Sequence, residues 1–273
     1  MGLSIASNTP AISLVSNLYD INRRLDVSST RLSSGYRINS SGDDPAGYAI
    51  SENLSALINS SGQATRNTND GISLVSVADD ASREVVDILK RIREIAVQGS
   101  SATLSASDRS NLETEMSELI SEVDRLASNT EFNDIQLTDG TKSTLDIQVG
   151  INGTSSDRIT VTLGDLSAST IGVDVLDVST TSASGTTIDR VDTAIDSVNG
   201  YRSQYGASQN RLEAAVDYID TYSQNLNVAR SNIRDVDFAA ETAERSKLLV
   251  LQKSSLAVLA QQLNAQENLL ALL

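Results

Sequence analysis

The 273-residue chain contains no cysteine, no histidine and no tryptophan. Without cysteine and histidine it cannot form disulfides, Cys/His metal sites, thiol nucleophiles or histidine-based acid–base catalysts. Two Phe and seven Tyr leave any core aliphatic, which suits the narrow seams between packed helices. We therefore expect no enzyme activity, no catalytic or metal-binding residue and no cofactor.

Positive charge is also scarce, with 21 Lys and Arg against 36 Asp and Glu and a formal net charge of -15. Nucleic-acid binding depends on cationic neutralisation of phosphates, so we expect no nucleic-acid partner. Residues 1–10 lack the basic and apolar regions of a secretory signal peptide. Polar residues interrupt the uncharged stretch 1–19, which is too polar to span a bilayer. We expect no membrane partner, and any export must use a route without a cleaved signal peptide.

Apolar residues at alternating spacings of three and four predict several long helices. The first ends near the turn-rich segment 35–47, which predicts an irregular connector. A Ser/Asp cap at 105–108 predicts the start of another helix, which should fold back antiparallel on the one before it. The predicted seams run through residues 11–32, 74–95, 112–126, 188–226 and 249–273.

Between residues 129 and 187 the apolar period changes to two. Apolar residues alternate over 145–149 and 159–163, and the turn-forming segment 152–156 lies between them. Ser, Thr and Gly dominate 179–187, which predicts a loop at the far tip. The predicted fold is mainly α, an elongated antiparallel helical bundle or coiled coil with a small β-hairpin element at the distal tip.

The two terminal helices present more apolar surface than one thin seam can cover, because leucines also lie beside the C-terminal seam. We expect them to order by packing against further copies of the chain, although periodicity alone fits an ordinary antiparallel bundle equally well. The residues predicted to carry this polymerisation are Leu14, Leu18, Ile21, Leu25, Leu32, Leu249, Leu256, Leu259, Leu263 and Leu270.

Several ordered blocks resemble bacterial flagellin, in a short form that lacks large outer domains. The segment RLSSGYRINSSGDDPAGYAIS at 31–51 is similar to the flagellin signature that links the inner coiled coil to the outer rod. Further similar blocks are NTNDGISLVSV at 67–77, LKRIREIAVQ at 89–98, YRSQYGASQNRL at 201–212 and SNIRDVDFAAETAERSKLLVLQKSSLAVL at 231–259. Such long, ordered matches are far more specific than a short motif.

The resemblance implies a domain organisation. An inner coiled-coil domain would comprise 1–33 and 235–273, joined through linkers at 34–47 and 222–234 to an outer helical rod at 48–221. The β element would occupy about 132–186, and longer flagellins would insert their variable domains between about 140 and 185. The linker residues singled out by the signature are Gly35, Asn39, Asp43, Asp44 and Gly47.

The resemblance also implies a function and partners. The chain would be an extracellular structural subunit that polymerises into the flagellar filament for swimming motility, exported unfolded through the flagellar type III apparatus. An export chaperone would bind the C-terminal helix around 238–273, and filament cap and hook-junction proteins would contact the polymer. Contact with Toll-like receptor 5 would involve Arg91, Ile95 and Glu115, although receptor-activating relatives carry Leu at position 95 and Arg where Leu119 stands.

Three alternatives remain at the level of sequence. A hook-filament junction protein shares the terminal helices and would stop at a short ring, and a non-polymerising helical binding protein would have protected termini. An enzyme could use the carboxylate pairs at 43–44 and 79–80, but these fall in a turn-rich linker and on an exposed helix face.

Overall fold

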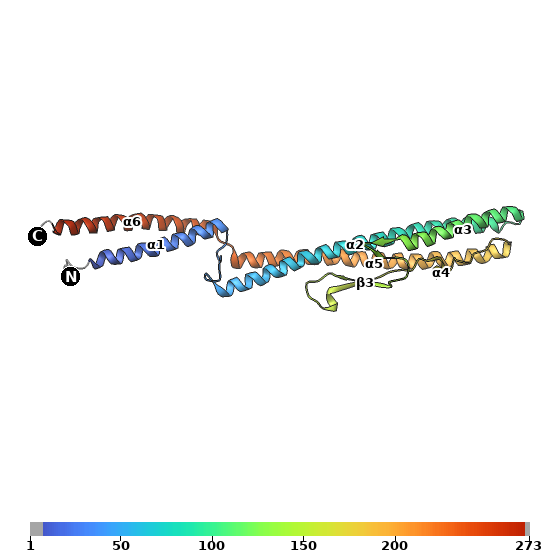
Figure 1. Ribbon diagram of the computed structural model, residues 1–273, viewed down its shortest axis with the longest axis horizontal. Helices are drawn as coiled ribbons and strands as arrows, with labels where there is room; N and C mark the ends of the chain where they lie inside the picture. The colour runs from blue at the N-terminus through green and yellow to red at the C-terminus, as the bar shows by residue number, and fades with distance from the viewer. Residues whose placement is uncertain (1–7, 271–273) are drawn as a thin grey trace. The chain divides into compact units, whose positions relative to one another are not determined.

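The computed structural model describes the backbone of residues 8–270 and side chains as far as residue 265. Long helices that pack on one another dominate the fold, with two small antiparallel strand pairs, which confirms the predicted mainly α class (Figure 1). The helices are α1 (Thr9–Ser34), α2 (Pro45–Gly99), α3 (Ala106–Asn129), α4 (Ala168–Ile171), α5 (Thr181–Arg234) and α6 (Phe238–Leu270). The strands are β1 (Glu131–Phe132), β2 (Ile135–Gln136), β3 (Thr144–Gln148) and β4 (Arg158–Thr162).

The chain divides into two compact units. The terminal unit comprises residues 1–58 and 225–273, and the central unit comprises residues 59–224. Both divisions fall inside a continuous helix, the first in α2 and the second in α5. The segment 222–234, predicted as a linker, is helical throughout because α5 continues to Arg234.

Helix α1 begins and ends where its sequence predicts. The Asn8 side chain accepts a hydrogen bond from Ala11 N at 3.1 Å, and Pro10 occupies the first turn, where its missing N–H costs nothing. Gly35 closes the helix in the left-handed region, with φ of 77°. The predicted connector therefore starts at Gly35 because this glycine permits a backbone conformation that other residues adopt only with strain.

Helix α2 is longer than its leucine and isoleucine pattern predicts. It starts at Pro45, although the apolar seam was expected from residue 74 onward. Small residues continue the same seam toward the N-terminus, and Ser61, Ala64 and Thr68 are all buried there. The Thr68 hydroxyl donates to Ala64 O at 2.7 Å, so its buried polar atom is satisfied within the helix. An apolar period cannot reveal a seam that is built from serine, threonine and alanine.

One core of the central unit lies between α2, α3, α4 and the first half of α5. Ile92, Ile95, Met116 and Val198 are almost completely buried in it. The predicted cap of α3 is present as a capping box, in which Ser105 Oγ accepts from Asp108 N at 3.2 Å and Asp108 Oδ2 accepts from Ser105 N at 3.0 Å. This confirms the start of the antiparallel helix.

A second core lies where the β3–β4 hairpin packs on α2 and α5. Leu145 pairs with Val161 and Ile147 with Ile159, so the two alternating segments form the predicted β-hairpin. Ile147 and Val161 pack with Val75, Tyr205 and Leu212 of the two long helices.

The position of the hairpin differs from the prediction. It lies alongside the middle of α2 and α5 (Figure 1), so the expectation of a hairpin at the distal tip is wrong. The segment 179–187 is also no extended loop, because α5 begins at Thr181. Ser184 and Thr187 are buried there, and hydroxyl bonds satisfy their polar atoms: Ser184 Oγ donates to Thr180 O and Thr187 Oγ1 to Asp177 O.

Tyr205 joins the second core to the backbone beyond β4. Its hydroxyl accepts a hydrogen bond from the Gly164 N–H at 2.8 Å in a buried setting, and burial raises the pKa of Tyr205. The phenylalanine variant would leave that N–H buried without a partner. We expect Tyr205→Phe to lower the free energy of unfolding by about 1–3 kcal/mol, measured by urea denaturation. Tyr218→Phe is the matched control because Tyr218 is 70% exposed; equal stability of the two variants would contradict this account.

Candidate self-assembly surface

Helices α1 and α6 lie side by side in the terminal unit (Figure 1). Ala11, Leu25 and Ser28 of α1 are buried, and the other predicted α1 residues, Leu14, Leu18, Ile21 and Leu32, are half-buried. Their spacing places them along one side of α1. The α1 seam thus exists as predicted, but within the chain it is used first to pair α1 with α6.

Polar contacts fix how α6 lies against α1. Arg24 Nη2 lies 2.5 Å from Glu244 Oε1, and Arg31 Nη1 lies 3.8 Å from Glu241 Oε2. Gln252 Nε2 donates to Asn22 Oδ1 at 2.6 Å. These bonds connect residues more than 200 positions apart and set the rotation of α6 about its axis.

The face of α6 that meets α1 coincides only in part with the predicted heptad stripe. Leu248 is 1% exposed, and Gln252, Ser255 and Leu259 continue its side of the helix as half-buried residues. Leu249 is also half-buried, whereas Leu256 and Leu263 remain 48% and 49% exposed. The leucines of α6 cover a broad arc that includes both the predicted stripe and Leu248, so their spacing alone could not identify the paired face. The side chain of Leu270 lies outside the described residues.

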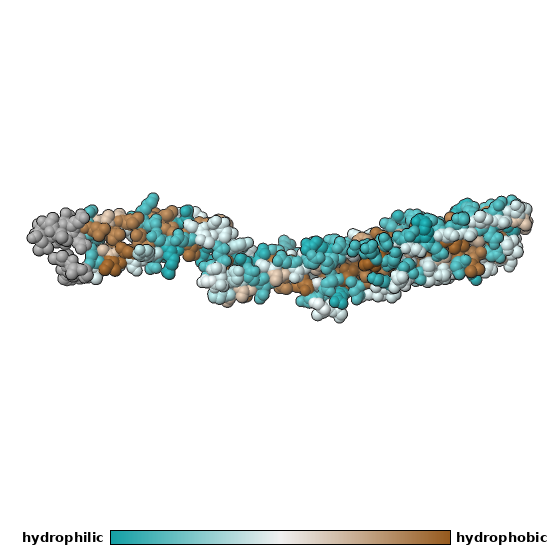
Figure 2. Space-filling model, in the orientation of Figure 1, coloured by the Kyte–Doolittle hydropathy of each residue, from teal (hydrophilic) through white to brown (hydrophobic). Residues whose placement is uncertain are grey.

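A band of apolar side chains therefore stays uncovered on the paired terminal helices. Figure 2 shows apolar residues gathered over α1 and α6. The exposed members are Ile12, Val15, Tyr19 and Val27 of α1 and Val250, Leu251, Leu256, Val258 and Leu263 of α6. A cavity of about 330 Å³ lies between the two helices, lined mainly by Ala11, Ile12, Val15, Leu259 and Leu263. An exposed apolar surface of this kind marks a site of protein association.

The connector between α1 and α2 is held by its own aspartates. Asp43 Oδ2 accepts from the N–H groups of Ser40 at 2.9 Å and Asn39 at 3.0 Å, and these bonds lower the pKa of Asp43. Asp44 Oδ1 accepts from Gly47 N at 3.0 Å and so caps the first turn of α2. Two of the residues that the signature singled out, Asp43 and Asp44, thus act on the backbone of this segment.

Arg234, which the sequence analysis did not single out, attaches the connector to the end of α5. Its carbonyl accepts from Arg37 N at 2.6 Å, and its guanidinium lies 4.6 Å from the centre of the Tyr36 ring. The guanidinium also lies 5.6 Å from the Tyr48 ring centre and pairs with Glu52 at 2.7 Å. No local pattern could have indicated these contacts, because they join segments almost 200 residues apart.

The three positions aligned with receptor contacts differ in their accessibility. Arg91 Nη2 lies 2.6 Å from Glu115 Oε1, and about half of each side chain is exposed. The hydrogen bonds to Glu115 and Glu94 raise the pKa of Arg91. Ile95 is completely buried in the helical core, so its assignment as a contact residue is wrong for this conformation. Leu119 is half-buried against the same core.

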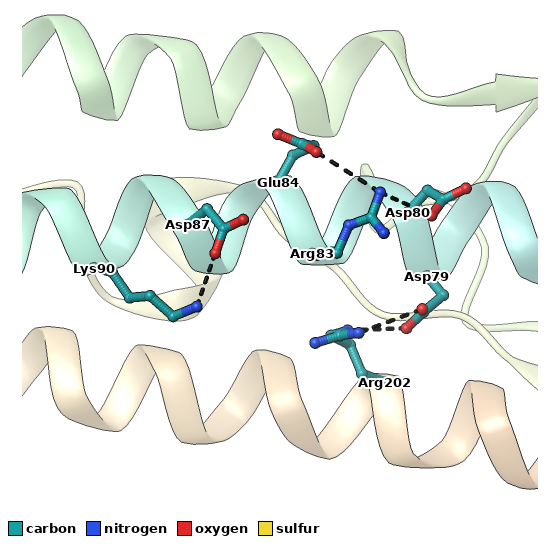
Figure 3. Close-up of polar contacts among 7 residues, drawn as sticks. All are labelled: Asp79, Asp80, Arg83, Glu84, Asp87, Lys90 and Arg202. Carbon is teal, nitrogen blue, oxygen red and sulfur yellow. Dashed lines mark hydrogen bonds and ion pairs between the residues drawn. The ribbon is translucent and has the colours of Figure 1, made fainter.

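The carboxylates of the pair at 79–80 are both engaged in ion pairs. Figure 3 shows Asp79 facing Arg202 of α5, with Asp79 Oδ1 at 2.9 Å from Arg202 Nε, while Asp80 Oδ1 lies 3.2 Å from Arg83 Nη2 on α2 itself. Along the same helix, Lys90 lies 2.8 Å from Asp87 and lowers the pKa of that carboxyl. These contacts position and neutralise charge along α2. Within residues 8–270 no acidic cluster suited to a metal ion is present, and no helix there is long and apolar enough to cross a bilayer.

The buried Gly47 offers a test of the connector. A Cβ at this position would collide with the Asp44 carboxylate and would lie 2.7 Å from Ile38 Cδ1, which is itself buried. We expect Gly47→Ala to destabilise the terminal unit by about 1–2 kcal/mol, since overpacking exceeds the gain in helix propensity. This destabilisation would be measured as faster proteolytic cleavage within residues 35–47. Gly42→Ala is the control, because its nearest neighbour would be 3.5 Å away; equal cleavage rates would refute the prediction.

Comparison with known proteins agrees with this arrangement. Residues 5–143 match the family described as the bacterial flagellin N-terminal helical region, and residues 188–273 match the bacterial flagellin C-terminal helical region. A flagellin of Halalkalibacterium halodurans is 41% identical over 243 residues, 89% of each chain. A flagellar filament 33 kDa core protein of Treponema phagedenis is 34% identical over 98% of this chain and 99% of its own. The crystal structure of Bacillus cereus flagellin aligns with a TM-score of 0.51 at 28% identity, covering 60% of this chain and 94% of that chain. Matches across both ends of the sequence show that the chain belongs to the bacterial flagellin family.

Proposed function

We propose that this chain is a structural subunit that self-assembles into the extracellular filament of the bacterial flagellum and so serves swimming motility. The observation that carries the proposal is the apolar band left uncovered on α1 and α6 after these helices have paired. The name of its Treponema phagedenis relative, a flagellar filament core protein, supports the same role.

The uncovered band explains why one copy is incomplete. Val250, Leu251, Leu256 and Leu263 expose between 40% and 66% of their surface. Complete burial of such a side chain contributes roughly 1.5–3 kcal/mol relative to full exposure, so neighbours that cover several of them supply a substantial driving force. A surface that binds a different surface on the next copy generates an open helical array rather than a closed dimer.

The domain organisation follows from this role. Residues 1–33 and 235–273 would form the inner polymerising domain, and residues 48–221 the outer one, with linkers at 34–47 and 222–234. The uninterrupted helicity of 222–234 would make this second linker a stiff connection. The β element at about 132–186 would be the place where longer flagellins carry additional domains.

Further partners would use the same terminal surface. An export chaperone that covers α6 would prevent premature association, since this helix exposes apolar side chains on several sides. Export through the flagellar type III apparatus without a cleaved signal peptide fits a chain that assembles outside the cell. Filament cap and hook-junction proteins would meet the two ends of the polymer.

Two alternative functions make predictions that differ from those of a filament subunit. A hook-filament junction protein would form only a short ring, and a non-polymerising helical binding protein would remain monomeric at every concentration. Electron microscopy of purified protein distinguishes both from a subunit that forms long filaments.

The polymerising role of α6 can be tested at Leu256 and Leu263. We expect the double variant Leu256→Ser, Leu263→Ser to raise the critical concentration for filament growth by about tenfold to a hundredfold, because a neighbour would bury less apolar area. Sedimentation and electron microscopy measure this. Thermal unfolding of the monomer should change little, since both side chains are about half exposed.

The buried Leu248→Ala serves as the contrasting variant. It should weaken the α1–α6 pair and lower monomer stability by about 2–5 kcal/mol. Assembly of the double variant at the parent's critical concentration would refute the assignment of this surface. A parent that never forms filaments would refute the function itself.

Recognition by Toll-like receptor 5 is a second proposal, supported by the half-exposed Arg91–Glu115 pair that joins α2 to α3. We expect Arg91→Ala to weaken signalling in receptor-bearing cells by about tenfold, because an arginine at an interface commonly dominates binding. Lys90→Ala is the matched control, since Lys90 is the exposed neighbour and pairs only locally with Asp87. If the Arg91→Ala variant signals as strongly as the Lys90→Ala variant, the proposed contact between Arg91 and the receptor is refuted.

A further inference from the structure

A polar cavity of about 320 Å³ lies between α1 and α6, apart from the apolar cavity near their ends. Its polar lining consists of Arg23, Arg24, Ser28, Arg31, Glu241 and Glu244. The side chains of Arg23 and Arg24 are 79% and 57% exposed, so the cavity is accessible from solvent on their side.

Positive charge exceeds negative charge in this lining. Three guanidinium groups face two carboxylates, and both carboxylates are already engaged, Glu244 with Arg24 and Glu241 with Arg31. Arg23 reaches only Asp20 on its own helix, at 3.4 Å. Arg23 therefore has its counter-ion on α1, while Glu244 is shared between Arg24 and Lys247, whose Nζ lies 3.2 Å from Glu244 Oε2. With these partners counted, four cations face three carboxylates around the cavity.

Two buried polar atoms of the lining also lack partners. Ser28 is 2% exposed, and no hydrogen bond to its Oγ exists among the described residues. Arg31 Nε is buried and likewise unpaired within the described part of the chain. Buried donors in native proteins are nearly always satisfied, so an unpaired pair beside a cavity indicates a group that enters it.

The chemistry of these atoms specifies that group. A guanidinium Nε–H only donates, and a serine hydroxyl can donate, so both are satisfied by an acceptor. Excess positive charge favours an anionic acceptor, and arginine pairs well with planar carboxylates. The cavity is suited to a carboxylate oxygen.

We propose that this cavity accepts an Asp or Glu carboxylate from a second copy of the chain, an inference that rests on the proposed filament. Copies that each carry a net charge of -15 repel one another, and a cationic cavity on each copy offsets part of that repulsion. Val27, which lines the same cavity, belongs to the exposed apolar band. The polar site is thus continuous with the surface that assembles.

Ser28→Ala separates this role from a structural one. Removing an unpaired hydroxyl should leave monomer stability unchanged or slightly increased, whereas it removes a donor to the incoming carboxylate. We expect the critical concentration to rise about tenfold, which corresponds to about 1.4 kcal/mol. Ser29→Ala is the control, because Ser29 is exposed on the same helix. Assembly of Ser28→Ala at the parent's critical concentration would overturn the inference and leave the proposed function intact.

Ser28→Asp tests the same cavity in the opposite direction. Its own carboxylate should accept from the unpaired Arg31 Nε–H, protect the α1–α6 pair from proteolysis in the monomer and exclude the neighbour, so that assembly fails. A variant that is protected and still polymerises normally would contradict the inference.

A free anion and a carboxylate from a second copy are distinguished by two measurements. In the first, the monomer is titrated with sodium acetate or inorganic phosphate while the Arg31 Nε–H signal is followed by NMR. Weak binding of acetate, together with a filament map in which the cavity holds a neighbour's side chain, is the expected result. Isolated density for phosphate, or water alone, would overturn the assignment to a second copy. A parent that forms no filament would instead remove the proposed function and this inference together.

Discussion

Helix α6 carries apolar side chains on every side, whereas α1 covers only the side that contains Leu248 and Leu259. This mismatch is the constraint on which the behaviour of the terminal unit depends. A helix covered on one side buries little apolar area for each residue that it orders, so its stability depends on further partners. The ion pairs of Arg24 and Arg31 lie along the covered side, and the remaining leucines stay exposed.

The central unit differs because its helices bury their apolar residues against one another within a single chain. Its helices pair over long distances and enclose two continuous cores, one among α2 to α5 and one beneath the β3–β4 hairpin. Ile95 and Tyr205 are completely buried there, and the charges along α2 are matched by neighbours such as Arg202. This unit can therefore be stable without another copy, whereas the terminal helices remain open to association.

The connector shows how backbone requirements, rather than side-chain chemistry, explain a dense motif. Gly35 adopts a left-handed conformation, Asp43 and Asp44 accept from backbone N–H groups, and Gly47 leaves room for Ile38. Arg234 then fixes the segment through its carbonyl and its contacts with two tyrosine rings. A pattern of aspartates that could suggest catalysis serves to order a turn.

The sequence by itself determined the helical class, the end of α1 at Gly35, the cap of α3 at Ser105 and the hairpin of β3 with β4, because each depends on neighbouring residues. The sequence also identified the α1 seam, because the residues of that seam follow a regular spacing along one side of the helix. Ile95 lies on the predicted seam at 74–95, and its burial agrees with that pattern. Tertiary structure alone decided which face of α6 is covered and that the hairpin lies along the helices. Those outcomes depend on contacts between segments far apart in the chain, and a helix with leucines over a broad arc, or a seam of serine and threonine, has no local period that specifies them.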